Sequence, residues 1–277
     1  MAVKLDINGV TLGVEQVGSG HPTVVFLHGI TANRRVWDPV VERLAERFTC
    51  VSVDQRGHGI SDKPNSGYSH VDYSDDIKGL AQYLSPEAGI YVVGHSLGAR
   101  NAVVAASRFP ELVRGVVAID FVPFIEAEVF DRLEARVIDG EQAFESVADV
   151  ERYLKQRYVH LPEDAIHRRA TYGYRRSGSR GWVPMASAQA MVETVRGLRS
   201  DLEPFWKSAR PPIVAIRGND SLLVSAEAFE KAGQANPSVV RKIVVGADHY
   251  VPEEAPDEVA KIVEEFIHEQ MMSPAHR

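Results

Sequence analysis

The sequence has few cysteines and no long apolar stretches, and both absences exclude classes of protein. It contains a single cysteine, Cys50, in 277 residues, which excludes a disulfide framework and a cysteine-rich metal site. No stretch approaches the roughly 18 consecutive apolar residues that a membrane-spanning helix needs. The first residues also lack the long apolar stretch of a signal peptide. We therefore expect a cytoplasmic protein.

Positive charge and several binding motifs are also scarce. Lys and Arg number 31 against 38 Asp and Glu, a formal net charge of −7, so we expect no nucleic-acid or membrane partner. There is no G-x-G-x-x-G after a strand, no G-x-x-x-x-G-K-[ST] and no H-E-x-x-H. We therefore expect no cofactor and no metal, and a small-molecule substrate as the partner. No pattern indicates an oligomeric state.

What is present is a regular alternation of short apolar runs with amphipathic stretches. An Asn8-Gly9 turn between two alternating runs predicts an initial hairpin. The alternation predicts an α/β fold, with a mostly parallel central sheet and helices on both faces. Strands are predicted at 23–27, 49–53, 90–93, 115–119, 213–216 and 241–245, and helices at 36–47, 72–84, 97–109, 226–235 and 256–270.

The middle of the chain breaks this alternation. From about residue 124 to 205, helical and charge-rich stretches dominate and buried strands are missing. We predict that 1–123 and 206–277 form one core and that 124–205 is a helical cap inserted on the sheet. In this cap, residues 152–199 carry ten basic and three acidic side chains. Such a surface suits an anionic substrate, although a solvated helix face explains the same pattern.

The motif with the clearest chemistry is Gly94-His95-Ser96-Leu97-Gly98, between a predicted strand and a predicted helix. This G-x-S-x-G context is typical of a nucleophile elbow, where a serine on a strained turn lies at the sheet edge. Glycines flank it because the neighbouring backbone approaches closely. Ser96 is the predicted nucleophile, and the N–H of Leu97 is one predicted oxyanion donor.

A second motif, His28-Gly29-Ile30, follows the strand predicted at 23–27. In this position the N–H of Ile30 is the other predicted oxyanion donor. We interpret His28 as a loop-packing or substrate-facing residue, and not as the general base.

With a third motif, Asp54-x-Arg56-Gly57-His58-Gly59-x-Ser61, the chain resembles the α/β-hydrolase superfamily over nearly its whole length. The resemblance implies an α/β-hydrolase fold in which the Arg56–Ser61 loop is structural. It also implies a general base on the loop after the last strand, where Gly246-Ala247-Asp248-His249-Tyr250 offers His249.

The carboxylate that supports this base has two candidates. The position usual in the family, three residues after Gly218, is occupied by Ser221, and Asp220 lies one position short of it. Asp120 follows the strand predicted at 115–119, and a carboxylate there must be paired or hydrogen-bonded. We favour Asp120, with Ser221 nearby, and keep Asp220 as the alternative.

The C-terminal third supports a narrower resemblance. Arg217-Gly218-x-x-Ser221-x-Leu223-Val224-Ser225 and the run 246–251 are similar to the hydrolases that open 2-(acetamidomethylene)succinate in vitamin B6 breakdown. That group has a serine at the usual acid position and takes its aspartate from the earlier strand. The resemblance implies an amide or enamide bond in a small dicarboxylate. It also implies substrate contacts at Arg136 and Arg157 in the cap. We predict further substrate contacts at His28, Ser221 and Tyr250.

The residues together predict a metal-free serine hydrolase that cleaves an ester or amide bond of a small, carboxylate-bearing substrate through an acyl-enzyme. Two alternatives stay open. One is a general carboxylesterase or lactonase with a neutral substrate. The other is a member of the fold that binds a ligand without turning it over.

Overall fold

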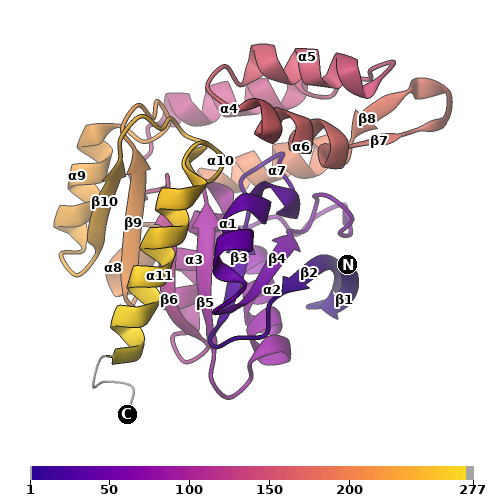
Figure 1. Cartoon of the computed structure of the whole chain (residues 1–277). Coiled ribbons are helices and arrows are strands. Elements are labelled where there is room, and N and C mark those ends of the chain that lie inside the picture. The colour runs from indigo at the N-terminus through magenta and orange to yellow at the C-terminus, as the bar shows by residue number, and fades with distance from the viewer. Residues whose placement is uncertain (1, 273–277) are drawn as a thin grey trace.

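The computed structural model describes residues 2–272 (Figure 1). An eight-stranded sheet has the order β1-β2-β4-β3-β5-β6-β9-β10, and a separate two-stranded sheet pairs β7 with β8. The strands are β1 (Val3–Ile7), β2 (Val10–Val17), β3 (Thr23–Leu27), β4 (Thr49–Asp54), β5 (Ile90–His95), β6 (Val113–Ile119), β7 (Tyr174–Arg176), β8 (Trp182–Pro184), β9 (Ile213–Gly218) and β10 (Val240–Val244).

Helices connect and cover these strands. The helices are α1 (Asp38–Leu44), α2 (His70–Leu84), α3 (Leu97–Arg108), α4 (Ala127–Asp139), α5 (Val147–Arg157), α6 (Glu163–Gly173), α7 (Ala188–Leu198), α8 (Glu203–Ser208), α9 (Ala226–Ala235), α10 (Val251–Glu254) and α11 (Pro256–Met272). None of the helices within residues 2–272 has the length and apolar character needed to cross a membrane.

The sheet is mostly parallel, as predicted. From β4 to β10 all neighbouring strands run parallel, and only β2 is antiparallel to its neighbours β1 and β4. The parallel strands from β4 to β9 are buried along nearly their whole length because both faces of the sheet are covered, whereas the edge strand β10 is largely exposed. Their carboxyl ends therefore meet at one edge, where the motif residues lie.

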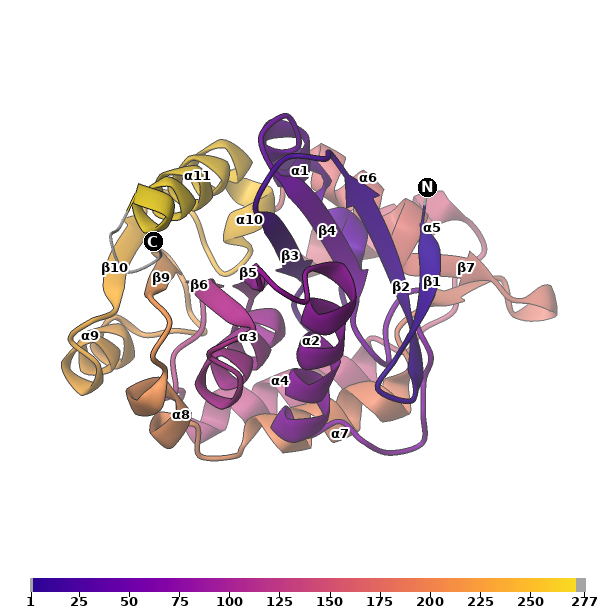
Figure 2. The same cartoon turned by 90° about the horizontal axis from the view of Figure 1, so that it is seen from below.

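Two apolar cores lie on the two faces of the sheet. Side chains alternate between them along each strand, so Val92 packs into one core and Val93 into the other. The helices α2, α3, α8 and α9 cover the first face, and α1 and α11 cover the second (Figure 2). This two-sided burial holds the strand ends in fixed positions.

Two predicted helix starts differ in detail from the structure. The helix expected at 72–84 begins at His70, because Ser69 caps it and Asp72 completes a capping box as the third helical residue. The helix expected at 36–47 is shorter. A 3₁₀ turn (Arg34–Trp37) leads into α1, which ends at Leu44.

Residues 124–205, here called the cap, lie over the carboxyl ends of the strands (Figure 1). Helix α4 packs against α7, α5 packs against α6, and the hairpin β7–β8 follows α6. Helix α8 instead packs against α3 and α9 of the core. The predicted cap boundary at residue 205 therefore falls inside a helix that packs on the core.

Candidate active site

Ser96 lies on a sharp turn between β5 and α3. Its φ of 51° and ψ of −110° lie outside the ordinary regions for a residue with a side chain. The turn is tight enough that a Cβ on Gly94 would come 2.4 Å from the amide nitrogen of Ala99, and one on Gly98 would come 2.1 Å from the carbonyl oxygen of Leu27. Both glycines are therefore required by the backbone packing around Ser96.

The loop after β3 lies against this turn. A Cβ added to Gly29 would come 3.4 Å from the Cβ of Ser96, so the 28–30 backbone runs directly beside the serine. Ile30 lines a cavity with Ser96, and Leu97 is buried as the first residue of α3. The predicted oxyanion donors therefore lie on two segments that meet at Ser96.

Two buried histidines hold this loop. Nδ1 of His28 donates to the carbonyl oxygen of Gly29 (2.8 Å), and its Nε2 accepts from the amide of Gln55 (3.1 Å). Nδ1 of His58 donates to the carbonyl oxygen of Arg56 (3.0 Å), and its Nε2 accepts from the amide of Thr31 (3.3 Å). Each ring must be neutral to accept a hydrogen bond in this way.

Burial keeps both rings neutral. It lowers the pKa of His28 to about 4, helped by the positive charges of Arg169 and Arg34. It lowers the pKa of His58 to about 3, with a further contribution from His28, whose ring lies 4.7 Å away. The loop beside Ser96 therefore depends on two uncharged imidazoles.

Asp120 holds the imidazole of His249. Nδ1 of His249 lies 2.7 Å from Oδ2 of Asp120, which is completely buried. The hydroxyl of Ser221 donates to the same Oδ2 (2.7 Å), and the amide of Gly218 donates to Oδ1 (3.2 Å). These bonds satisfy a buried carboxylate and orient the ring, since Nε2 is then the nitrogen free to face Ser96.

His95, the residue before Ser96, holds the backbone of His249. Its Nε2 donates to the carbonyl oxygen of His249 (2.7 Å), and the two rings lie 4.7 Å apart. Burial, followed by the nearby His249, lowers the pKa of His95 well below its usual range. A neutral His95 thus connects the serine turn to the loop that carries His249.

These groups open into a cavity of about 300 Å³. Ser96, Ile30, His249 and Tyr250 line it from the core. From the cap it is lined by the four arginines Arg132, Arg136, Arg157 and Arg169, together with Tyr158 and apolar residues of α4. The chemistry of the strand edge therefore faces a strongly basic cover.

Tyr158 lies at the centre of these charges. The guanidinium groups of Arg136 and Arg169 each lie 4.8 Å from the centre of its ring, and the ring of Tyr250 lies 5.1 Å away. Burial by itself would raise the pKa of Tyr158, but the positive charges of Arg169, Arg136 and Arg157 outweigh it and lower the pKa. The shift reflects a positive potential in this part of the cavity.

Comparison with known proteins agrees with this geometry. A family model described as "Alpha/beta hydrolase family" matches residues 24–262. The chain belongs to the alpha/beta hydrolase family. This hydrolase is 50% identical over 264 residues to the 2-(acetamidomethylene)succinate hydrolase of Mesorhizobium japonicum, covering 95% of this chain and 94% of the relative. The resemblance predicted from the motifs is therefore confirmed.

Solved structures agree with this assignment. The crystal structure of E-2-(acetamidomethylene)succinate hydrolase is 49% identical to this hydrolase, with a TM-score of 0.94, over 97% of this chain and 99% of that chain. A thioesterase domain from the curacin biosynthetic pathway is 23% identical, with a TM-score of 0.82, over 95% and 99% of the two chains. At that identity the likeness concerns the fold alone.

Three further predicted site residues of this hydrolase do not line the cavity that Ser96 lines. His28 is fully buried beneath the loop and does not line the cavity, and Ser221 bonds to Asp120 instead of facing a substrate. These positions agree with the loop-packing interpretation of His28 and with the expected place of Ser221 beside Asp120, and they do not fit the substrate contacts also predicted for the two residues. The alternative acid, Asp220, is exposed and bonds to Asn219 (3.0 Å), so it does not support His249.

One buried ion pair was missed by the reasoning from the sequence. Nε of Arg169, on α6, donates to both oxygens of Glu253, on α10, at 3.0 and 3.1 Å, and Nη2 donates to Oε2 as well. Both side chains are buried, and Arg169 also lies 4.9 Å from the ring of Tyr250. The pair links residues 84 positions apart, and no local pattern relates such positions.

No cluster suited to a metal ion occurs among the residues that the structure describes. Within residues 2–272, three or more His, Cys, Asp or Glu side chains do not converge in an arrangement that could hold one. Near Ser96, each carboxylate and imidazole named above has a hydrogen-bonded partner within the protein.

Proposed function

We propose that this hydrolase cleaves an amide or ester bond of a small dicarboxylate through a covalent acyl intermediate on Ser96. The observation that carries the proposal is the 2.7 Å contact between His249 and the buried Asp120, in the cavity that Ser96 also lines. A nucleophile, a base oriented by a carboxylate and two loop amides around one cavity are the parts that acyl transfer requires.

In the first half of the reaction, Nε2 of His249 takes the proton of the Ser96 hydroxyl while Oγ attacks the carbonyl carbon. The amides of Leu97 and Ile30 stabilise the oxyanion that forms, and Asp120 stabilises the imidazolium. His249 then gives its proton to the leaving nitrogen or oxygen. The carbon–heteroatom bond breaks, and the acyl group stays on Ser96.

In the second half, His249 takes a proton from water, and the hydroxyl attacks the acyl carbon. The oxyanion forms again, the bond to Ser96 breaks, and the proton on His249 returns to Oγ. A carboxylic acid leaves and the free serine is restored. With 2-(acetamidomethylene)succinate as substrate, the acyl group would be acetyl and the leaving atom the enamine nitrogen.

The cap supports a substrate with two carboxylates. Guanidinium groups bind carboxylates through paired hydrogen bonds. Arg136 and Arg157, for which the narrower resemblance implied substrate contacts, both line the cavity. We propose that these two side chains, with Arg169, bind the carboxylates, and that Tyr250 packs beside the reacting group.

The test compares Ser96→Ala with the wild-type protein on 2-(acetamidomethylene)succinate and on a neutral activated acetate ester. We expect Ser96→Ala to lose about 10⁴-fold or more in kcat and to lose labelling by a fluorophosphonate. Ser107→Ala, on the same helix but outside the cavity, is the control and keeps full activity. Unchanged turnover in Ser96→Ala would rule out the serine mechanism.

Charge reversal tests the substrate class separately. Arg157→Glu is expected to lower kcat/KM for the dicarboxylate by about 10²-fold and to leave the neutral ester nearly unaffected. Equal losses on both substrates would point to a general esterase.

A further inference from the structure

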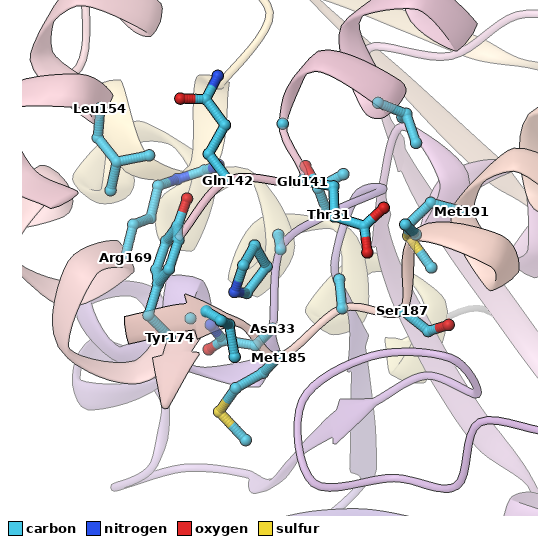
Figure 3. Close-up of a pocket in the computed structure, with 18 of the residues that line it drawn as sticks. Thr31, Asn33, Glu141, Gln142, Leu154, Arg169, Tyr174, Met185, Ser187 and Met191 are labelled. Atoms are coloured by element: carbon cyan, nitrogen blue, oxygen red, sulfur yellow. The ribbon is translucent and has the colours of Figure 1, made fainter. Parts of the chain in front are cut away.

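A second and larger cavity lies beside the proposed reaction site, between the cap and the core. Its volume is about 640 Å³, within the range of small-molecule sites in proteins. Figure 3 shows Arg169 and Tyr174 on one side of it, and Thr31 and Met191 on the other. None of the steps proposed above uses this space.

The lining of the larger cavity is strongly basic. It includes one carboxylate, Glu141, and the six cationic side chains of Lys63, Arg136, Arg157, Arg169, Arg175 and Arg180. Arg169 is paired with Glu253, and Arg157 contacts Asp139 at 3.1 Å. A cavity with this imbalance attracts small anions.

Four of these cations lack a carboxylate partner among residues 2–272. Lys63 donates instead to the carbonyl oxygens of Gly59 and Ser61, each at 2.8 Å, and Arg180 donates to the hydroxyl of Ser177 at 3.2 Å. Within that same range, Arg136 and Arg175 also have no acidic partner. Their charge is thus available to a bound anion.

The two cavities share a wall. Arg136, Arg157, Tyr158 and Arg169 line both of them. Nη2 of Arg136 donates to the carbonyl oxygen of Arg157 (3.0 Å), and Nη2 of Arg157 donates to that of Arg136. An anion bound in the larger cavity therefore lies next to the arginines that face Ser96.

The hairpin β7–β8 carries two adjacent arginines, of which only Arg175 lines the larger cavity. Arg175 pairs with Val183 across the hairpin, and both line the cavity. Arg176 pairs with Trp182, and neither lines it. Both arginines are exposed, so they differ mainly in the direction in which they face.

We propose that the larger cavity is a second binding site, for a small organic anion with two carboxylates, that holds the substrate before it enters the reaction cavity. This inference rests on the proposed function for the identity of its ligand. Unpaired cations on several walls suit a ligand with a carboxylate at each end. Because the shared arginines line both cavities, the anion can bind to them before it leaves the other cations of the larger cavity.

The direct test is a calorimetric titration with succinate. We expect two binding events per chain in the wild-type protein, one for each cavity. Arg175→Glu should weaken one event at least tenfold, and Arg176→Glu, the matched control, should keep both. A single event in the wild-type protein, or equal weakening in the two variants, would overturn the proposal.

Kinetics provide a second measurement. Arg175→Glu should lower kcat/KM for the dicarboxylate about threefold to tenfold at low salt, with kcat unchanged, and the loss should shrink in high salt. Loss of kcat, or the same loss in Arg176→Glu, contradicts a capture site. The titration involves no turnover, so failure of the serine mechanism, seen as full activity in Ser96→Ala, remains distinct from failure of this proposal.

Discussion

The strand edge and the cap reach the same cavity by different physical means. At the strand edge, backbone contacts position Ser96 and the loop beside it, and glycines make these contacts possible. In the cap, long charged side chains and aromatic rings line the cavity, and partners far away in the chain hold them in place. One region is built by local geometry and the other by tertiary pairing.

The difference indicates how the proposed reaction and the selection of its substrate are divided between the two regions. Attack on a carbonyl needs atoms placed within a few tenths of an ångström, which a rigid turn supplies. Selection by charge tolerates longer and more flexible side chains, because Coulomb attraction falls off gradually with distance. The strand edge therefore suits the reaction, and the cap suits the choice of substrate.

The largest expected effect tests the strand edge. Asp120→Asn should lower kcat by about 10⁴-fold, because His249 loses the carboxylate that orients and stabilises its charged form. The backbone of Asp120 has φ +49°, a region that asparagine also tolerates, so the fold should persist. Asp220→Asn is the control with unchanged kcat. The reverse result would make Asp220 the supporting acid.

The next effect concerns the neutral imidazoles beneath the loop. The pKa values of about 4 for His28 and about 3 for His58 lie below the unfolded value of 6.5. The unfolded chain therefore takes up protons first as the pH falls, and stability present above pH 6.5 is lost toward pH 4. From pH 7 to pH 5 we expect a loss of about 2 kcal/mol for each histidine.

Urea unfolding at the two pH values measures this loss. His268→Gln, which removes an exposed histidine of α11, should leave the pH dependence as it is. A stability that stays flat from pH 7 to pH 5 would contradict the buried neutral state of both rings.

The third effect tests the link between cap and core. Glu253→Gln should lower the free energy of unfolding by about 3 kcal/mol, because it leaves the buried guanidinium of Arg169 without its charge partner. The exposed pair Lys155–Glu163 is the control, and Glu163→Gln should have no measurable effect. Thermal unfolding compares the variants, and equal behaviour would mean that the buried pair does not stabilise the fold.

The smallest effect compares two equivalent helix caps. Ser69 caps the N-terminus of α2 in the core and Ser146 caps that of α5 in the cap, each with a capping box. Ser69→Ala and Ser146→Ala should each lower the free energy of unfolding by about 1 kcal/mol, since cap and core share an apolar cluster and should unfold together. If only Ser69→Ala lowers it, the cap unfolds separately.

Local patterns were sufficient for most of the core. Apolar runs predicted β3, β4, β5, β6 and β9, because a parallel sheet covered on both faces requires apolar residues throughout. The edge strand β10 was also predicted, although most of it is exposed, and the short strands β7 and β8 of the cap were not predicted. The elbow motif predicted the strained turn at Ser96, because glycine is needed where backbones touch. The details that differed, such as the N-cap of α2 at Ser69, depend on which of several neighbouring residues forms the capping hydrogen bonds.

By itself, the sequence determined the order of strands and helices in the core and the position of Ser96, since these follow from patterns a few residues long. The position of His249 followed from its place after the last strand, as the family resemblance implied. Only the tertiary structure decided that Asp120 and not Asp220 meets His249. That choice depends on β6 lying next to β9 in the sheet. The structure also decided which arginines face the cavities, because packing brings together residues that are far apart along the chain.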